Sequence, residues 1–374
     1  MILKHTFKSS IEQQRGVALI VVLLIMALVT VLAVEMSARQ QINIARAVNI
    51  KTNNQAYWYA LGAEEFAKSS LATLKSLTGD NINLSQPWAQ EFEYPIEGGF
   101  IEAKLSDLQA CFNLNAIGSE YTPNASGGGS GGNGGTGNNG ATANNGGTGN
   151  SGGGNGNPSG GSSGTGTKGE AAQKAFETLL NKFTEDTYLA EVIKDSLIDW
   201  IDEDDRAAQL GAEDADYESL VTPYLPANNA MSHISELRLV NGVDQGAQAG
   251  WLNDLQKVVC VIPETNIKIN VNTITEESAI VLDALLGETA DIANGIISTR
   301  PEEGFTEIAE FFELNEVQSI QLSAEQRDWF DITTQYFKLN TKAKFQDSQF
   351  KMSTVFRVNE DGITIISREF GGAF

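Results

Sequence analysis

The hydrophobic positions of this 374-residue chain begin with one uninterrupted run. In residues 17–34 the only polar side chain is Thr30, and thirteen of the eighteen residues are Val, Ile or Leu. As a helix, the run would rise about 27 Å at about 1.5 Å per residue, just enough to cross the hydrocarbon core of a bilayer. We therefore predict a membrane-spanning helix over residues 17–34.

The chain keeps a helical pattern beyond this run. No Pro or Gly occurs between residue 35 and Gly62. Apolar residues recur at helical spacing, at Ile42, Ala45, Val48, Tyr59, Phe66 and Leu74, and are expected to line one side. The pattern predicts a single N-terminal helix over residues 17–77, amphipathic in its second half.

Strand-like alternation marks both ends of the remaining sequence. It occurs in residues 91–94, 100–105, 336–345, 350–359 and 363–370, with a typical hairpin turn from Asn359 to Gly362. Helical patterns fill the interval, in residues 173–183, 189–201, 232–240, 276–286, 290–299 and 305–312. The patterns predict an α+β protein in which an antiparallel sheet, from residues 88–110 and 335–374, packs on the N-terminal helix and carries a large all-α insertion.

The inserted region contains a repeat. Residues 111–115 read Cys-Phe-Asn-Leu-Asn and residues 268–272 read Lys-Ile-Asn-Val-Asn, each the end of a short strand whose Asn side chains can cap a following helix. After the second copy, Thr273 and Glu276 have the spacing of a capping box. The repeat predicts two helical modules, residues 111–260 and 261–334, similar to SAM-like and helix-hairpin-helix bundles.

Glycine is concentrated in one stretch of the first module. Residues 121–167 contain no charged side chain, and twenty of the 44 residues from 124 to 167 are Gly. Such a sequence buries too little apolar surface to offset the entropy lost on ordering. We predict a disordered insertion over residues 121–168.

Acidic residues are just as unevenly distributed. Asp and Glu number 48 against 25 Lys and Arg, a formal charge of -23, which argues against nucleic acid as a partner. Residues 195–218 alone hold ten acids and one base, a net charge of -9. Crowded carboxylates suit Ca²⁺, which takes six to eight oxygen ligands. The candidate ligands in the acidic segment, residues 199–218, are Asp202, Asp204, Glu213, Asp214 and Asp216; a solvated acidic face is the alternative.

The start of the chain indicates processing. Lys4, Lys8 and Arg15 form a short polar leader over residues 1–16, which ends in Gly16 directly before the apolar run. This arrangement resembles the processing site of type IV pilins and pseudopilins. The resemblance implies that a prepilin peptidase cuts after Gly16, that Val17 becomes a methylated N-terminus, and that the anchor stays in place.

The fifth residue after that cleavage point identifies a narrower resemblance. Most pilin-like proteins carry Glu there, where it is thought to neutralise the amino terminus of a neighbouring subunit, whereas this chain has Val21. A subunit with nothing above it needs no such carboxylate. Together with the large soluble region, Val21 makes the chain resemble the GspK family, the minor pseudopilins of bacterial type II secretion systems, and marks a subunit at the tip.

The resemblance implies a structural subunit without catalytic residues. It would be anchored in the inner membrane by a single span, with its bulk in the periplasm, and would help to start a pseudopilus that exports folded proteins. Its partners would be GspI-, GspJ- and GspH-like minor pseudopilins, the major pseudopilin, the prepilin peptidase and the inner-membrane assembly platform. In this family a Gly-Ala-Glu-Asp motif after an acidic run accompanies calcium, and residues 211–214 match it. In an oxidising periplasm Cys111 and Cys260 either pair or remain two buried thiols.

Two other functions compete with this interpretation. The first is a minor type IV or competence pilin that binds DNA through the helix-hairpin-helix-like repeat, but the turn at Gly287 lacks a second Gly and is followed by Glu288. A membrane-anchored, calcium-dependent hydrolase is disfavoured, because His5 and His233 are the only histidines and no nucleophile motif is present. We expect His233 to be an ordinary capping residue.

Overall fold

The computed structural model describes residues 15–79, 81–118, 169–287 and 292–371. The leader before Arg15 and the predicted insertion at 121–168 lie outside these residues. The chain forms two compact units. The first comprises the chain up to Thr73, Gln90–Ser106 and the chain from Lys338 onward, and the second comprises Leu74–Ala89 and Asp107–Phe337.

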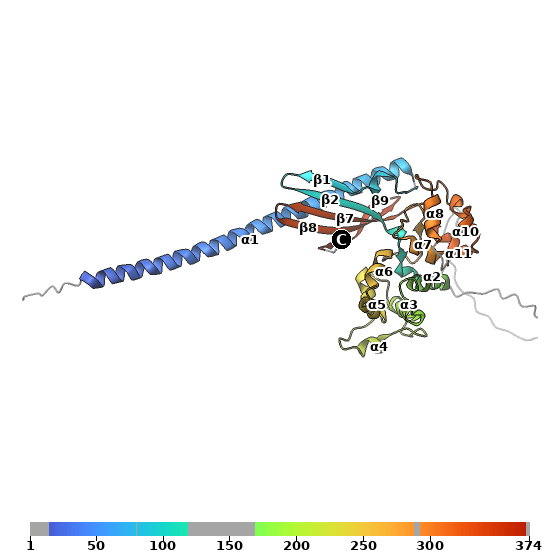
Figure 1. Ribbon diagram of the computed structural model, residues 1–374, viewed down its shortest axis with the longest axis horizontal. Helices are drawn as coiled ribbons and strands as arrows, with labels where there is room; N and C mark the ends of the chain where they lie inside the picture. Colours follow the sequence, from blue (N-terminus) through green and yellow to red (C-terminus); the bar gives the residue numbers. More distant parts are fainter. Residues whose placement is uncertain (1–14, 80, 119–168, 288–291, 372–374) are drawn as a thin grey trace, which may run out of the picture. The chain divides into compact units, whose positions relative to one another are not determined.

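The first unit consists of one long helix and one sheet (Figure 1). Helix α1 covers Arg15–Thr78, close to the predicted bounds. The sheet has the order β1-β2-β7-β8-β9, with β1 Phe92–Ile96, β2 Gly99–Asp107, β7 Tyr336–Phe345, β8 Ser348–Asn359 and β9 Gly362–Phe370. The pairs β1·β2 and β8·β9 are antiparallel, and Asn359 pairs with Gly362 at the predicted turn. All five predicted strands are confirmed within a few residues.

The residues predicted to line one side of α1 are buried only in part. Ile42, Val48 and Phe66 are each about half exposed, whereas Tyr59 packs against the sheet and Leu74 is buried. The buried stripe is made of small residues, Ala56, Ala60, Ala63 and Ala67, of which the first three pack with Ile101, Ala343 and Met352 of the sheet. A helix can approach a sheet closely through small side chains. The face of α1 that packs on the sheet is therefore determined by the small size of its side chains more than by their hydrophobicity.

One ion pair, between buried Glu64 and partly exposed Arg368, fixes α1 on the sheet. Glu64 is 1% exposed, and its carboxylate accepts hydrogen bonds from Nε and Nη2 of Arg368 at 2.7 Å each and from Thr354 Oγ1 at 2.8 Å. Burial alone would raise the pKa of Glu64, but the hydrogen bonds from Arg368 and Thr354 prevail and lower it. The pair fixes the rotation of α1 relative to β8 and β9.

The second unit contains the two helical modules. Its first module runs through η2 Leu108–Ala110, β3 Phe112–Asn113, η3 Leu114–Ala116, α2 Glu170–Leu180, α3 Thr187–Ile201, α4 Asp214–Glu218, η4 Ile234–Leu239, α5 Val243–Ala249, α6 Leu252–Val258 and β4 Val259–Cys260. The second module runs through β5 Ile269–Asn270, α7 Ala279–Leu285, α8 Ala293–Thr299, α9 Ile308–Phe312, α10 Asn315–Gln318, α11 Ala324–Asp328 and β6 Phe330–Asp331. Short 3₁₀ turn η1, Pro87–Ala89, precedes the sheet.

The two modules are built alike around their Asn residues. In each, the first short strand pairs in parallel with the last, β3 with β4 and β5 with β6. The Asn115 amide accepts from Met231 N at 2.7 Å and donates to Met231 O at 3.0 Å. Asn272 makes the same two bonds, at the same two distances, with Phe305. Each Asn thus ties its module's opening strand to the segment that precedes a later helix.

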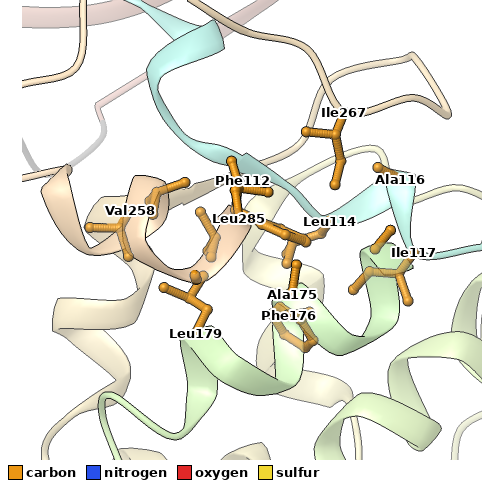
Figure 2. Close-up of a cluster of buried hydrophobic side chains, with 14 of the residues drawn as sticks. Phe112, Leu114, Ala116, Ile117, Ala175, Phe176, Leu179, Val258, Ile267 and Leu285 are labelled. Carbon is orange, nitrogen blue, oxygen red and sulfur yellow. The ribbon is translucent and has the colours of Figure 1, made fainter. Parts of the chain in front are cut away.

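A single core runs through both modules. Phe112 and Leu114, at the end of β3, lie among Phe176 and Leu179 of α2 and Leu285 of α7, and all are fully buried (Figure 2). Burying a side chain of this size contributes about 1.5–3 kcal/mol. The repeated strand ends are therefore the centre on which helices of both modules pack.

The capping box predicted at Thr273 is wrong. Helix α7 begins at Ala279, and the Thr273 hydroxyl instead donates to Asp107 Oδ2 at 2.5 Å. Asp107 also accepts from Thr334 Oγ1 at 2.6 Å and from Gln109 N at 2.6 Å. Burial of the carboxylate raises the pKa of Asp107 to about 6 despite these bonds. The Asp107 carboxylate thus joins Thr273, near the start of the second module, to Thr334 at its end. Thr273 therefore makes a long-range contact and does not cap a helix.

Candidate functional site

The acidic segment is an elaboration of the duplicated scaffold. In the second module α8 ends at Thr299, and only residues 300–304 separate it from Phe305. In the first module α3 ends at Ile201, and residues 202–230 separate it from Met231, which holds the equivalent place. The shared fold thus needs only a short turn here, so the added loop is a candidate functional element.

Two carboxylates of α3 position this loop. Asp195 Oδ2 accepts from Leu210 N at 3.0 Å, and the Asp199 oxygens accept from Ala208 N at 2.9 and 3.1 Å. Gly211 passes so close that a Cβ there would lie 1.7 Å from Asp199 Oδ2. Any other residue at 211 would displace the Asp199 carboxylate. The spacing of four residues places both acids on one face of α3, facing the loop.

Four buried oxygen atoms in the acidic region lack a donor within the described residues. Glu213 is 6% exposed, and neither of its carboxylate oxygens has a hydrogen-bond partner within the described residues. The same holds for Asp202 Oδ1 and for Asn228 Oδ1, which are buried atoms of less buried residues. Buried polar atoms without partners are costly, and a bound cation or water would satisfy them. Hard oxygen atoms of this kind are what Ca²⁺ binds.

The charges around Glu213 reinforce this interpretation. Burial and, to a smaller extent, the negative charges of Asp199, Asp202, Asp205 and Asp214 together raise the pKa of Glu213 to about 7. Burial likewise raises the pKa of Asp199 to about 6, and it also raises the pKa of Asp202. Carboxylates that oppose one another's ionisation would be relieved by a bound dication.

The predicted ligands divide into two groups. Asp202, Glu213 and Asp214 belong to the mutually repelling set. Asp204 instead forms an exposed ion pair with Arg206 at 3.0 Å, and Asp216 accepts from Glu213 N at 3.1 Å at the start of α4. No three acidic, His or Cys side chains of the described chain are already gathered as a metal cluster. A cation would therefore have to draw the carboxylates together.

Sequence reasoning missed three groups at the site, the side chains of Asp199, Asp205 and Asn228. Asn228 Nδ2 donates to Asp205 Oδ1 at 3.3 Å, and its backbone has a φ of 42°. The only sequence signal was the position of Asp199 four residues after Asp195. Asn228 lies 23 residues from Asp205 and gave no signal at all.

The remaining candidate residues lie outside the acidic segment, residues 199–218. Cys111 and Cys260 form a disulfide across a separation of 149 residues, next to the paired strands β3 and β4. His233 caps η4, where its side chain accepts from Ser235 N. Gly16 and Val17 lie in the first turn of α1; Val17 is 59% exposed and Val21 48% exposed. The described part of α1 from Val17 has one window of mean hydropathy 3.3, which is apolar enough to cross a membrane.

Comparison with known proteins gives consistent matches. Two family models described as type II secretion system protein K match residues 110–264 and 269–333, which are the two modules. Type II secretion system protein K of Dickeya chrysanthemi is 33% identical over 96% of this chain and 98% of its own length. The protein of the same name from Aeromonas hydrophila is 29% identical over 97% and 98% of the two chains.

A solved structure also shares the fold. A chain in the crystal structure of the GspK-GspI-GspJ complex from enterotoxigenic Escherichia coli matches with a TM-score of 0.67 and 25% identity. The match covers 88% of this chain and all of that one. These matches confirm the α+β, pilin-like fold, and the chain belongs to the GspK family, the type II secretion system protein K pseudopilins.

Proposed function

We propose that the chain is the tip subunit of a type II secretion pseudopilus and helps to start its assembly. Membership of the GspK family supports this proposal, as does the GspK-GspI-GspJ complex of the related protein. GspI- and GspJ-like subunits would be its direct neighbours. A GspH-like subunit, the major pseudopilin and the assembly platform of the inner membrane would follow during growth.

The observation that carries the proposal is the apolar first part of α1. Residues 17–34 are exposed throughout and contain no carboxylate, so they offer apolar surface to lipid before assembly and to other helices in a fibre. With Val21 in place of Glu, the helix has nothing with which to neutralise the amino terminus of a subunit above it. The bulky second unit would then block further addition at that end.

Processing gives the direct test of this role. Gly16→Asp should leave an unprocessed precursor and abolish secretion. Val21→Glu, which introduces the same charge in the same helix, should be processed, and cells that carry it should secrete substantially more enzyme than cells with the Gly16 variant. Both proteins can be followed by mass spectrometry of the membrane-extracted chain and by assay of a secreted enzyme. Normal processing and secretion of the Gly16 variant would contradict the proposal.

We further propose that the acidic segment binds Ca²⁺ in the periplasm. Asp202, Glu213 and Asn228 would supply ligands, because their buried oxygens have no hydrogen-bond partner within the described residues. Asp199 would act indirectly by holding the loop. The cation would neutralise the repelling carboxylates and so order residues 202–213.

Calorimetric titration of the detergent-solubilised chain with Ca²⁺ tests this site. Heat of binding should be present in the natural chain and lost in Glu213→Gln. Asp204→Asn is the matched control, because Asp204 is exposed and paired with Arg206, and it should bind nearly as well. Equal binding by Glu213→Gln, or no heat in the natural chain, would refute the site.

A further inference from the structure

An exposed apolar loop follows the acidic segment in the first module. Residues 220–226 contain Leu220, Val221 and Leu225, which are 44%, 104% and 55% exposed. Val221 thus projects fully into solvent. Large aliphatic side chains gathered on one exposed loop are typical of a binding surface rather than of an ordinary turn.

The loop is anchored firmly. Tyr224 Oη donates to Leu239 O at 2.7 Å, which brings the loop beside a further exposed leucine. The Tyr224 ring lies 5.3 Å from that of Tyr217 and 6.4 Å from that of Trp200, both of which are buried. Prolines at 223 and 226 restrict the backbone on either side of the anchor. The leucines and the valine are therefore presented in a fixed arrangement.

The same anchor connects the loop to the acidic segment. Trp200 directly follows Asp199 on α3, and Tyr217 lies on α4, which Glu213 precedes. On the other side of the loop, Asn228 donates to Asp205. Packed aromatic rings on one side and a hydrogen bond on the other thus join the acidic segment to the apolar loop.

The charge around the loop indicates what it can bind. No Lys or Arg occurs between Arg206 and Arg238, while residues 195–218 carry a net charge of -9. Arg206 is paired with Asp204, and Arg238 donates to Gln256. Anionic lipid attracts Lys and Arg, so this surface suits a bilayer poorly. A protein surface with an apolar socket and a basic rim is complementary to it.

We propose that residues 220–226 form a docking loop that inserts Val221 and its leucine neighbours into a basic-rimmed apolar socket of a partner protein. Cation binding to the acidic segment would hold the loop in position for that contact. The inference rests on the proposed tip role, because a tip subunit is the one whose outer loops meet new partners. The docking loop would be a second contact surface, in addition to the α1 helix. It lies in the long connection between α3 and Met231, which has no counterpart of similar length in the second module.

Site-specific cross-linking in secreting cells tests the contact. A photoreactive phenylalanine analogue replaces Val221 in the full chain, and a matched one replaces Gln248, which is exposed on α5. We expect a protein adduct from position 221 only, whose cross-linked segment is apolar and flanked by Lys or Arg. An adduct to lipid, an adduct to an acidic segment, or no adduct specific to position 221 would overturn the proposal.

A charge substitution provides the functional arm. Val221→Asp should lower secretion about tenfold, the effect of about 1.4 kcal/mol of lost binding. Gln248→Asp, the same introduction of a charge at an exposed residue of α5 outside the loop, should have little effect. Both chains should be processed normally, which separates this test from that of Gly16. Normal secretion by Val221→Asp, beside defective secretion by the Gly16 variant, would refute the docking loop and leave the tip role intact.

Discussion

The stability of the second unit should fall as the pH rises when Ca²⁺ is removed. Burial and neighbouring charges raise the pKa of Glu213 from 4.5 to about 7, and burial raises that of Asp199 from 3.8 to about 6. A carboxyl group whose folded pKa exceeds its unfolded pKa keeps its proton in the folded state while the unfolded chain loses it. Stability is thus greatest below the unfolded pKa and is lost as the pH rises towards the folded value.

The size of the effect follows from the number of protons involved. Each group changes the free energy of unfolding by at most about 1.4 kcal/mol per pH unit. Between pH 4.5 and about 6 both Glu213 and Asp199 contribute, and from there to about 7 only Glu213 does. Asp107, with its pKa raised to about 6, adds a slope of the same sign that Ca²⁺ should not affect. The difference between chelator and Ca²⁺ therefore isolates the acidic segment.

Urea unfolding of the full chain in detergent, followed by near-ultraviolet circular dichroism, measures these slopes. In chelator the free energy of unfolding should fall across this pH range, and saturating Ca²⁺ should flatten the fall because bound carboxylates stay ionised in the folded state. Glu213→Gln should be more stable than the natural chain in chelator near pH 7, and should gain little from Ca²⁺. A stability that rises with pH in chelator, or equal Ca²⁺ effects in both chains, would refute the reasoning.

Three further substitutions test the surrounding structure, each by urea unfolding. Gly211→Ala places a methyl group against the Asp199 carboxylate, and should lower stability by about 2–4 kcal/mol and weaken Ca²⁺ binding; unchanged binding would show that the carboxylate does not position the loop. Asn272→Ala removes the acceptor of the buried Phe305 N–H, while Phe305 O keeps Asn81 Nδ2 as a donor; it should cost about 1–3 kcal/mol, and a loss below about 1 kcal/mol would show that this tie is dispensable. Cys260→Ser opens a 149-residue loop and should cost about 2–5 kcal/mol, whereas no loss would show that the disulfide does not constrain the unfolded chain.

The extended elements could be predicted because their signals are local. The apolar run that begins α1, the alternation in the strands and the turn at Asn359 each depend on neighbouring residues only. The repeat was visible because Asn113 and Asn115 recur as Asn270 and Asn272. The structure supplies the reason for this recurrence: each second Asn makes the same two backbone bonds in its own module.

The predictions that were wrong or incomplete depend on distant contacts. Thr273 has the spacing of a helix cap, but its hydroxyl bonds to Asp107, 166 residues away. On α1 the large apolar residues gave the visible pattern, whereas close approach to the sheet selects alanines such as Ala60. In the acidic segment, composition indicated a cation, but only the fold distinguishes buried Glu213 from exposed Asp204.

The position of the chain in the pseudopilus tests the central claim most directly. Pseudopili sheared from cells that overproduce the major pseudopilin can be labelled with gold-conjugated antibody against the second unit and imaged by electron microscopy. A tip subunit predicts one label site at one end of each fibre. Labels distributed along the fibre would contradict the tip role.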